Sequence, residues 1–81
     1  MESLKTIDFV AEGKECFNRG EFKKAKMIFS EVVESDGKND EAFFYLGNIF
    51  HGEGEIGKAI KAFHKTLEIN PEHTDAAISL S

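Results

Sequence analysis

The stretch DEAFFYLGNIFHGEGEIGKAIKAFHKTLEINP, residues 40–71, decides the fold of this 81-residue chain. Its first part has small and apolar residues at spacings of three and four, namely Phe43, Leu46, Gly47 and Phe50. A second series with the same spacing follows a glycine-rich turn, namely Ile56, Ala59, Ile60, Phe63, Leu67 and Ile69. Such spacing is typical of helix faces, and Pro71 ends the second series because proline cannot continue helical hydrogen bonding. The stretch therefore predicts two helices joined by a turn, with Asp40 as the cap of the first.

The same plan is present 34 residues earlier in the chain. At this offset identical residues coincide: Phe9 and Phe43, Gly13 and Gly47, Gly20 and Gly54, Glu21 and Glu55, Lys24 and Lys58, Ala25 and Ala59, Phe29 and Phe63, Glu34 and Glu68. A constant offset over both halves indicates stacked supersecondary units. We therefore expect a helix up to about Arg19, a turn at Gly20, and a helix from Phe22 to about Asp36.

Small residues are expected where the two helices of each unit come closest. Gly47 and Ala59 lack bulk there, and Phe43 and Phe63 are expected to fill the space beside them. The corresponding residues of the first unit are expected to do the same: Gly13, Ala25, Phe9 and Phe29. Cys16 occupies a core position of its unit, so we expect a small buried hydrophobe.

These residues resemble the tetratricopeptide repeat, whose pattern is W-x₂-L-G-x₂-Y…A-x₃-F…P with a period of 34 residues. The second unit reads Phe43-x₂-Leu46-Gly47-x₂-Phe50, then Ala59-x₃-Phe63, then Pro71. The first unit departs from the pattern at Glu12, Cys16 and Gly37. Polar residues on its first helix fit a terminal repeat, which presents a polar outer face.

The resemblance covers residues 6–73 and implies an all-α fold of stacked antiparallel helix hairpins, arranged as a right-handed superhelical solenoid. We expect a single domain over residues 1–81, with repeat units at 6–39 and 40–73. Residues 74–81 are expected to begin a C-terminal capping helix.

The stretch HGEGEIGKA, residues 51–59, also contains G-x-G-x-x-G and an incomplete phosphate-binding loop. Such a loop requires a preceding strand and a hydroxyl side chain that holds magnesium. Here a helical pattern precedes the glycines, and Ala59 stands where the hydroxyl belongs. Glu53 and Glu55 would add negative charge beside the phosphates. We therefore interpret the glycines as a turn.

Composition excludes several classes of partner. The formal net charge is −5, with 15 acidic and 10 basic residues, which disfavours nucleic-acid binding. No apolar run is long enough to span a membrane. The N-terminus lacks the basic and apolar regions of a signal peptide, and the single cysteine cannot form an internal disulfide. We therefore expect a cytoplasmic protein without membrane or nucleic-acid partners.

The reactive residue types are not spaced for chemistry. The three histidines, His51, His64 and His73, have no short spacing that suits a metal. No serine or cysteine has histidine and a carboxylate at a recognisable catalytic spacing. We therefore expect no catalytic residues, no metal and no cofactor, and no enzyme.

The resemblance implies a concave groove lined by the first helix of each unit. The residues expected to line this groove form a stripe on these two helices: Val10, Lys14, Phe17, Phe44, Tyr45, Asn48 and His51. Exposed aromatic rings beside hydrogen-bonding groups suit a peptide or helix of another protein. For Phe17 and Phe44, burial in the core remains an alternative to a position in the groove.

Some members of the family bind a C-terminal carboxylate through basic and amide side chains. Lys14 and Asn48 lie on the appropriate stripe. We disfavour this binding mode because nonbasic residues occupy the other positions that it requires, namely Val10, Tyr45, Asp75 and Ser79.

Two units with a fragment of a third leave apolar surface uncovered, since such repeats need about three units for stability. Ala76, Ala77 and Leu80 can cover part of it. The rest is covered either by further parts of a longer protein or by a second copy of the chain; we expect a homodimer, with these three residues at its interface. Two functions therefore remain open. One is an adaptor or scaffold that binds a partner protein, and the other is a homo-oligomerisation or structural module.

Overall fold

The structure is a computed structural model that describes the backbone of residues 2–73 and the side chains of residues 9–73. Within this part of the chain there are four helices and no strand: α1 Glu2–Asn18, α2 Phe22–Ser35, α3 Asp40–Gly52 and α4 Ile56–Ile69. The expected all-α fold is confirmed, and the helix ends agree with the expected ones except at the start of α3. No described helix is both long and apolar enough to cross a membrane.

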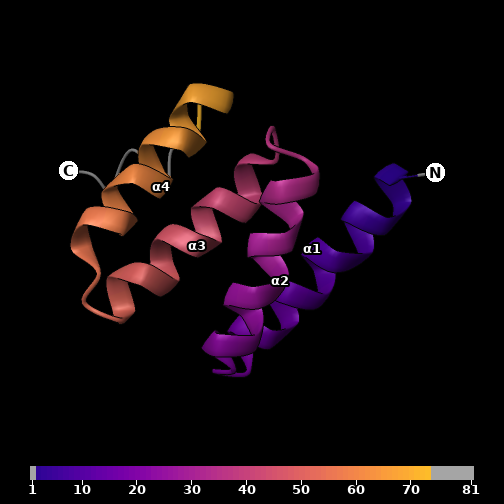
Figure 1. The fold of residues 1–81 in the computed structure, drawn as a ribbon, viewed down its shortest axis with the longest axis horizontal. Coiled ribbons are helices and arrows are strands. Elements are labelled where there is room, and N and C mark those ends of the chain that lie inside the picture. Colours follow the sequence, from indigo (N-terminus) through magenta and orange to yellow (C-terminus); the bar gives the residue numbers. More distant parts are fainter. Residues whose placement is uncertain (1, 74–81) are drawn as a thin grey trace.

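The helices form two antiparallel hairpins that lie side by side, α1 with α2 and α3 with α4 (Figure 1). Helix α3 lies between α4 and α2 and also contacts α1. The right-handed superhelical path stays a prediction. The expected capping helix and the expected interface residues Ala76, Ala77 and Leu80 lie outside the described residues.

Each hairpin turns at a glycine in the left-handed backbone region, Gly20 at φ 83° and Gly54 at φ 80°. Glycine suits this conformation because it has no Cβ to clash. The backbone amide of the residue after each glycine donates a hydrogen bond to a carbonyl near the end of the preceding helix. The Glu21 amide donates to the Cys16 carbonyl at 2.9 Å, and the Glu55 amide donates to the Phe50 carbonyl at 2.8 Å. The glycines thus end helices and reverse the chain, as predicted. A helix, rather than a strand, precedes those of residues 51–59.

The start of α3 corrects one expectation. The N-cap is Asn39, not Asp40: Asn39 has an extended backbone, and its side-chain oxygen accepts a hydrogen bond from the Ala42 amide at 3.0 Å. A side chain caps a helix only from a non-helical position, and Asp40 is already the first helical residue. Its carboxylate instead accepts a hydrogen bond from Asn70 Nδ2 at 3.0 Å.

Gly13 in α1 and Gly47 in α3 make room for aromatic rings. A Cβ placed on Gly47 would lie 2.6 Å from the Phe63 ring, and one on Gly13 would lie 2.7 Å from the Phe29 ring. The expected close approach within each unit is therefore confirmed for Phe29 and Phe63.

The expectation for Phe9 is wrong, because this ring is 42 % exposed instead of filling the space beside Gly13. Its counterpart Phe43 is half-buried, since α2 packs against α3. No described helix packs against α1 in the corresponding way.

A continuous apolar core joins the hairpins. Buried residues from all four helices belong to it, including Val10, Ile28, Val32, Leu46 and Ala62. Cys16 is buried in the same core, as expected. The buried hydroxyl of Thr66 donates to the Ala62 carbonyl at 3.0 Å, so its burial leaves no unpaired donor.

Candidate functional site

A row of rings crosses the junction between the hairpins. We call it the aromatic row, and it consists of Phe22, Phe17, Tyr45, Phe44 and His73 in order of contact. Successive ring centroids are 5.3, 5.1, 5.6 and 4.7 Å apart. These distances are typical of favourable aromatic pairs. The row therefore connects side chains of α2, α1 and α3 with the segment that follows α4.

The centre of the row is anchored on the core. Tyr45 stacks on Phe29 with centroids 5.2 Å apart and an interplanar angle of 5°. Phe44 contacts the ring of Phe63 with centroids 6.0 Å apart. Phe17, Phe44 and Tyr45 are nevertheless only half-buried. Each ring thus packs on the core with part of its surface and leaves the rest accessible.

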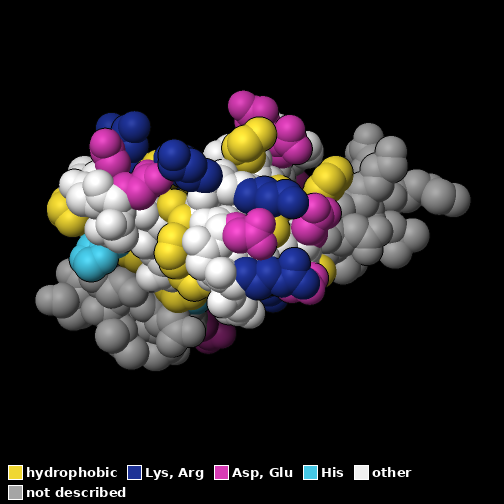
Figure 2. Space-filling model, turned by 90° about the horizontal axis from the view of Figure 1, so that it is seen from below, with side chains coloured by type: hydrophobic (Ala, Val, Ile, Leu, Met, Phe, Trp, Pro, Cys, Tyr) yellow, Lys and Arg dark blue, Asp and Glu magenta, His cyan; other side chains and the backbone are white. Residues whose placement is uncertain are grey.

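The end of the molecule at which both hairpins turn carries hydrophobic side chains between two charged groups. In Figure 2 they form a band that runs between a mixed acidic and basic cluster on the left and another on the right. An apolar strip with charged flanks is the usual arrangement of a protein contact site.

Helix α1 contacts α3 at Phe17, which meets Tyr45, and also nearer its own N-terminus, where Val10 and Lys14 lie. With Ala11, Asn39 and Glu41 they line a cavity of about 220 Å³. Val10 is 8 % exposed, so it supplies an apolar wall and little open surface. Lys14 pairs with Glu41 of the second hairpin. The hydrogen bond with the Glu41 carboxylate raises the pKa of the Lys14 ammonium.

The two remaining predicted groove residues lie on α3. Asn48 is half-buried and donates through Nδ2 to the Phe44 carbonyl at 3.3 Å. His51 is exposed in the last turn of α3. The structure thus brings Phe17, Phe44 and Tyr45 into mutual contact and places Val10 and Lys14 around one cavity, whereas Asn48 and His51 belong to neither group.

Sequence reasoning missed Phe22 and His73 in the row and Glu41 in the cavity. Phe22 had a signal, since Ile56 at the corresponding position keeps its apolar character. Glu41 and His73 had no signal in the sequence, because only folding brings Glu41 to Lys14 and His73 to Phe44.

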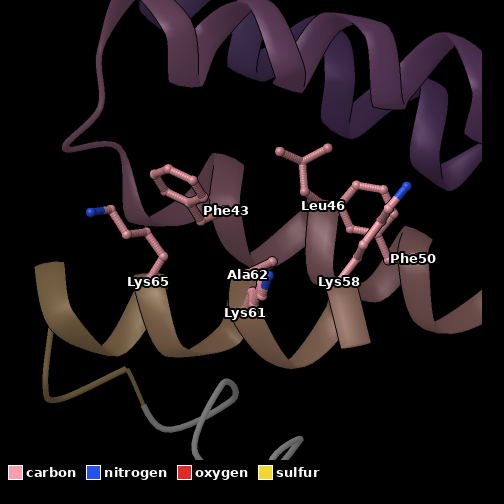
Figure 3. Close-up of a pocket in the computed structure, with 7 residues that line it drawn as sticks. All are labelled: Phe43, Leu46, Phe50, Lys58, Lys61, Ala62 and Lys65. Carbon is pink, nitrogen blue, oxygen red and sulfur yellow. The ribbon is translucent and has the colours of Figure 1, made fainter. Parts of the chain in front are cut away.

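A second groove was also missed. It has a volume of about 330 Å³ and lies along α3 and α4 (Figure 3). Its lining residues are Phe43, Leu46, Phe50, Lys58, Lys61, Ala62 and Lys65. The signal in the sequence was the spacing of the three lysines, which places them on one side of α4.

The hairpin of α3 and α4, with the Phe63 ring seated on Gly47, coincides with a recognised repeat. The family model for the tetratricopeptide repeat matches residues 40–73. Residues 40–73 are therefore recognised as a tetratricopeptide repeat. Tetratricopeptide repeats are in general non-catalytic modules of protein–protein interaction. The described residues of the chain contain no group of three histidine, cysteine or acidic side chains that could hold a metal.

Proposed function

We propose that this chain is an adaptor or scaffold module that binds a peptide or a helix of a partner protein along α1 and α3. The observation that carries the proposal is the half-buried aromatic row, which runs from one hairpin to the other through Phe17, Tyr45 and Phe44. Rings held in place by the core offer apolar contact area without much loss of side-chain entropy on binding.

Polar side chains near this surface could fix the orientation of a bound peptide or helix. Asn48 and His51 lie on α3, the helix that also carries Phe44 and Tyr45, and Glu41, the partner of Lys14, lies in the first turn of α3. A ligand carboxylate that approached Lys14 would have to compete with Glu41. We therefore propose an internal peptide segment or a helix as the ligand, rather than a C-terminal carboxylate.

We further propose that residues 6–39 and 40–73 act as two repeat units of one domain. Both contain a helix glycine under a phenylalanine ring, and both turn at a glycine with positive φ. These correspondences support the first hairpin as a divergent copy of the second.

Homo-oligomerisation is the second candidate, and two residues of α4 favour it. Ile56 and Ile60 are 49 % and 43 % exposed, and their spacing places them on the same side of the helix. Exposed neighbouring isoleucines are typical of surfaces that another protein covers. In this alternative a second copy covers them in a homodimer, with Ala76, Ala77 and Leu80 as its further predicted residues.

One experiment separates the two functions. Peptides are selected from a displayed random library on the immobilised chain, and the affinity of the best peptide is compared between the natural chain and the double variant Asn48→Ala, His51→Ala. We expect the variant to bind about tenfold more weakly, because two flanking polar contacts are lost. His64→Ala is the matched control, since His64 is exposed on α4, and it should bind as the natural chain does.

Light scattering on the same proteins gives the second readout. A mass that stays monomeric over a concentration series, together with weakened peptide binding, supports the adaptor. A concentration-dependent dimer that Ile60→Glu dissociates, with no selectable peptide, would instead establish the oligomerisation module.

A further inference from the structure

The groove along α3 and α4 is built differently from the aromatic row. Its floor is apolar and consists of Phe43, Leu46, Phe50 and Ala62. Its rim consists of the ammonium-bearing side chains of Lys58, Lys61 and Lys65. We call it the lysine-rimmed groove. None of its lining residues belongs to the aromatic row, so it is a separate surface.

The three lysines extend along the whole groove. In Figure 3 Lys58 reaches up beside the ring of Phe50, Lys65 lies near Phe43 at the other end, and Lys61 lies between them. Spacings of three and four residues place all three on one side of α4. The apolar floor therefore has positive charge along one full edge.

This positive charge is poorly compensated. Among the described residues, Lys61 and Lys65 make no ion pair, and Lys58 reaches only Glu55, at 3.8 Å with 64 % of its side chain exposed. At the Phe50 end, the ammonium groups of Lys26 and Lys58 lie 5.8 and 5.7 Å from the ring centroid. Lys26 is held there by Glu53 at 3.0 Å. The groove is thus a local cationic site on a chain whose net charge is −5.

We propose that the lysine-rimmed groove binds an acidic peptide segment of a partner protein. One bulky apolar side chain of the segment enters between Phe43 and Phe50, and its neighbouring carboxylates pair with Lys61 and Lys65. The volume of about 330 Å³ is at the small end of ligand pockets, which span about 300–1,000 Å³, and so it takes one or two side chains. This site is additional to the ligand proposed for α1 and α3.

The distribution of charge on the chain favours an acidic peptide over a membrane surface or a nucleic acid as the partner. A membrane surface or a nucleic acid extends well beyond the groove and would also face the acidic side chains elsewhere on the chain. A short segment meets only the rim and the floor. Its apolar side chain is also matched by the floor, which a phosphate backbone would leave unused.

The test uses a short fluorescein-labelled peptide of aspartate and glutamate with Leu-Phe at its centre. A second peptide has Ala-Ala at the centre. We expect the first to bind and the second to bind at least about tenfold more weakly, because the apolar floor then has no partner. Raising the salt concentration should weaken binding of the first peptide.

Charge-reversed variants locate the site. Lys61→Glu, Lys65→Glu should lower the affinity for the Leu-Phe peptide at least about tenfold. The matched control is Lys23→Glu, Lys24→Glu, which changes the net charge equally on exposed positions of α2. It should bind nearly as the natural chain does. Circular dichroism checks that both variants keep their helix content.

Amide shifts in NMR spectra separate this site from the one proposed for α1 and α3. The Leu-Phe peptide should shift Lys61, Ala62 and Lys65 and leave Phe17 and Asn48 in place. The proposal is overturned if the natural chain does not bind, if both variants lose equal affinity, or if the shifts fall on the aromatic row. It is also overturned if anionic vesicles compete the peptide away, or if light scattering shows that a second copy occupies the groove.

Discussion

At Gly47 the helices of the second hairpin approach so closely that the Phe63 ring occupies the space of a side chain. The ring is 3 % exposed, and the surrounding core holds it. A methyl group on residue 47 would have to displace the ring or separate the helices. The smallest side chain at this position therefore determines how tightly α3 and α4 pack.

We predict that Gly47→Ala lowers the free energy of unfolding by about 1–3 kcal/mol, because the new Cβ overpacks the contact. This cost outweighs the gain of up to about 1 kcal/mol that alanine brings as a better helix former. Urea denaturation measures the difference. Gly52→Ala is the matched control, since that glycine also lies in α3 but has open space around it, and it should be neutral or stabilising. Equal destabilisation by both variants would contradict the packing argument.

Some of these residue-level features could be predicted from the sequence. Gly13 and Gly47 recur at one offset together with Phe29 and Phe63, so their contact could be anticipated. The exposure of Phe9 could not, because it depends on which helix covers α1 rather than on the residue itself. The same limit applies to Phe17 and Phe44, whose rings are neither core nor surface but half-buried.

At the scale of single elements, the helices were predictable from their periodicity and the turns from the glycines. The cap of α3 was not, since Asn39 and Asp40 are adjacent and both residue types are good caps. Only the backbone conformation decides between them. The lysine-rimmed groove was missed for a similar reason: lysines on one side of a helix normally face water, and only the packing of α3 against α4 places an apolar floor beside them.

We predict that Asn39→Ala lowers the free energy of unfolding by about 1 kcal/mol, because the Ala42 amide loses its acceptor. Asn39→Asp should retain most of the stability, since an aspartate oxygen can accept the same hydrogen bond and favours the helix N-terminus. Thermal unfolding followed by circular dichroism compares the three proteins. If Asn39→Asp were as unstable as Asn39→Ala, the hydrogen bond would not be the cause.

At the scale of the whole molecule, two ion pairs among the described side chains connect the hairpins across their shared core. Lys14 of α1 pairs with Glu41 of α3, and Lys26 of α2 pairs with Glu53 directly after α3. Partly exposed pairs of this kind contribute little to stability individually. Their positions on two different helices of the first hairpin nevertheless favour one orientation between the hairpins. This long-range pairing has no signature in the local sequence pattern.

The Lys14 pair predicts a specific pH dependence. The hydrogen bond with Glu41 raises the pKa of Lys14 in the folded chain. The resulting stabilisation is fully present below the unfolded-chain pKa of about 10.4 and is lost as the pH rises through the higher folded pKa. The stability difference between the natural chain and Lys14→Met should therefore be constant near neutral pH and shrink in strongly alkaline solution, as measured by urea denaturation.

Two controls accompany this prediction. Lys23→Met removes an exposed lysine that makes no ion pair among the described residues, and its stability difference should not follow the titration of Lys14. In NMR titrations, Glu41→Gln should bring the pKa of Lys14 back toward its usual value. An unchanged pKa in that variant would show that Glu41 is not the cause.

The second hairpin is fastened at the end opposite its turn, where Asn70 Nδ2 donates to Asp40 Oδ2 at 3.0 Å and the Thr66 hydroxyl lies 3.5 Å from the Asp40 carbonyl oxygen. The first residue of one helix is thereby clasped to the last turn of the other. Fraying of the start of α3 and fraying of the end of α4 are therefore coupled, because either one must break these hydrogen bonds. The backbone also enters and leaves the hairpin at neighbouring points. Inserting such a hairpin into a polypeptide would therefore add a folded unit while hardly increasing the distance between the flanking segments.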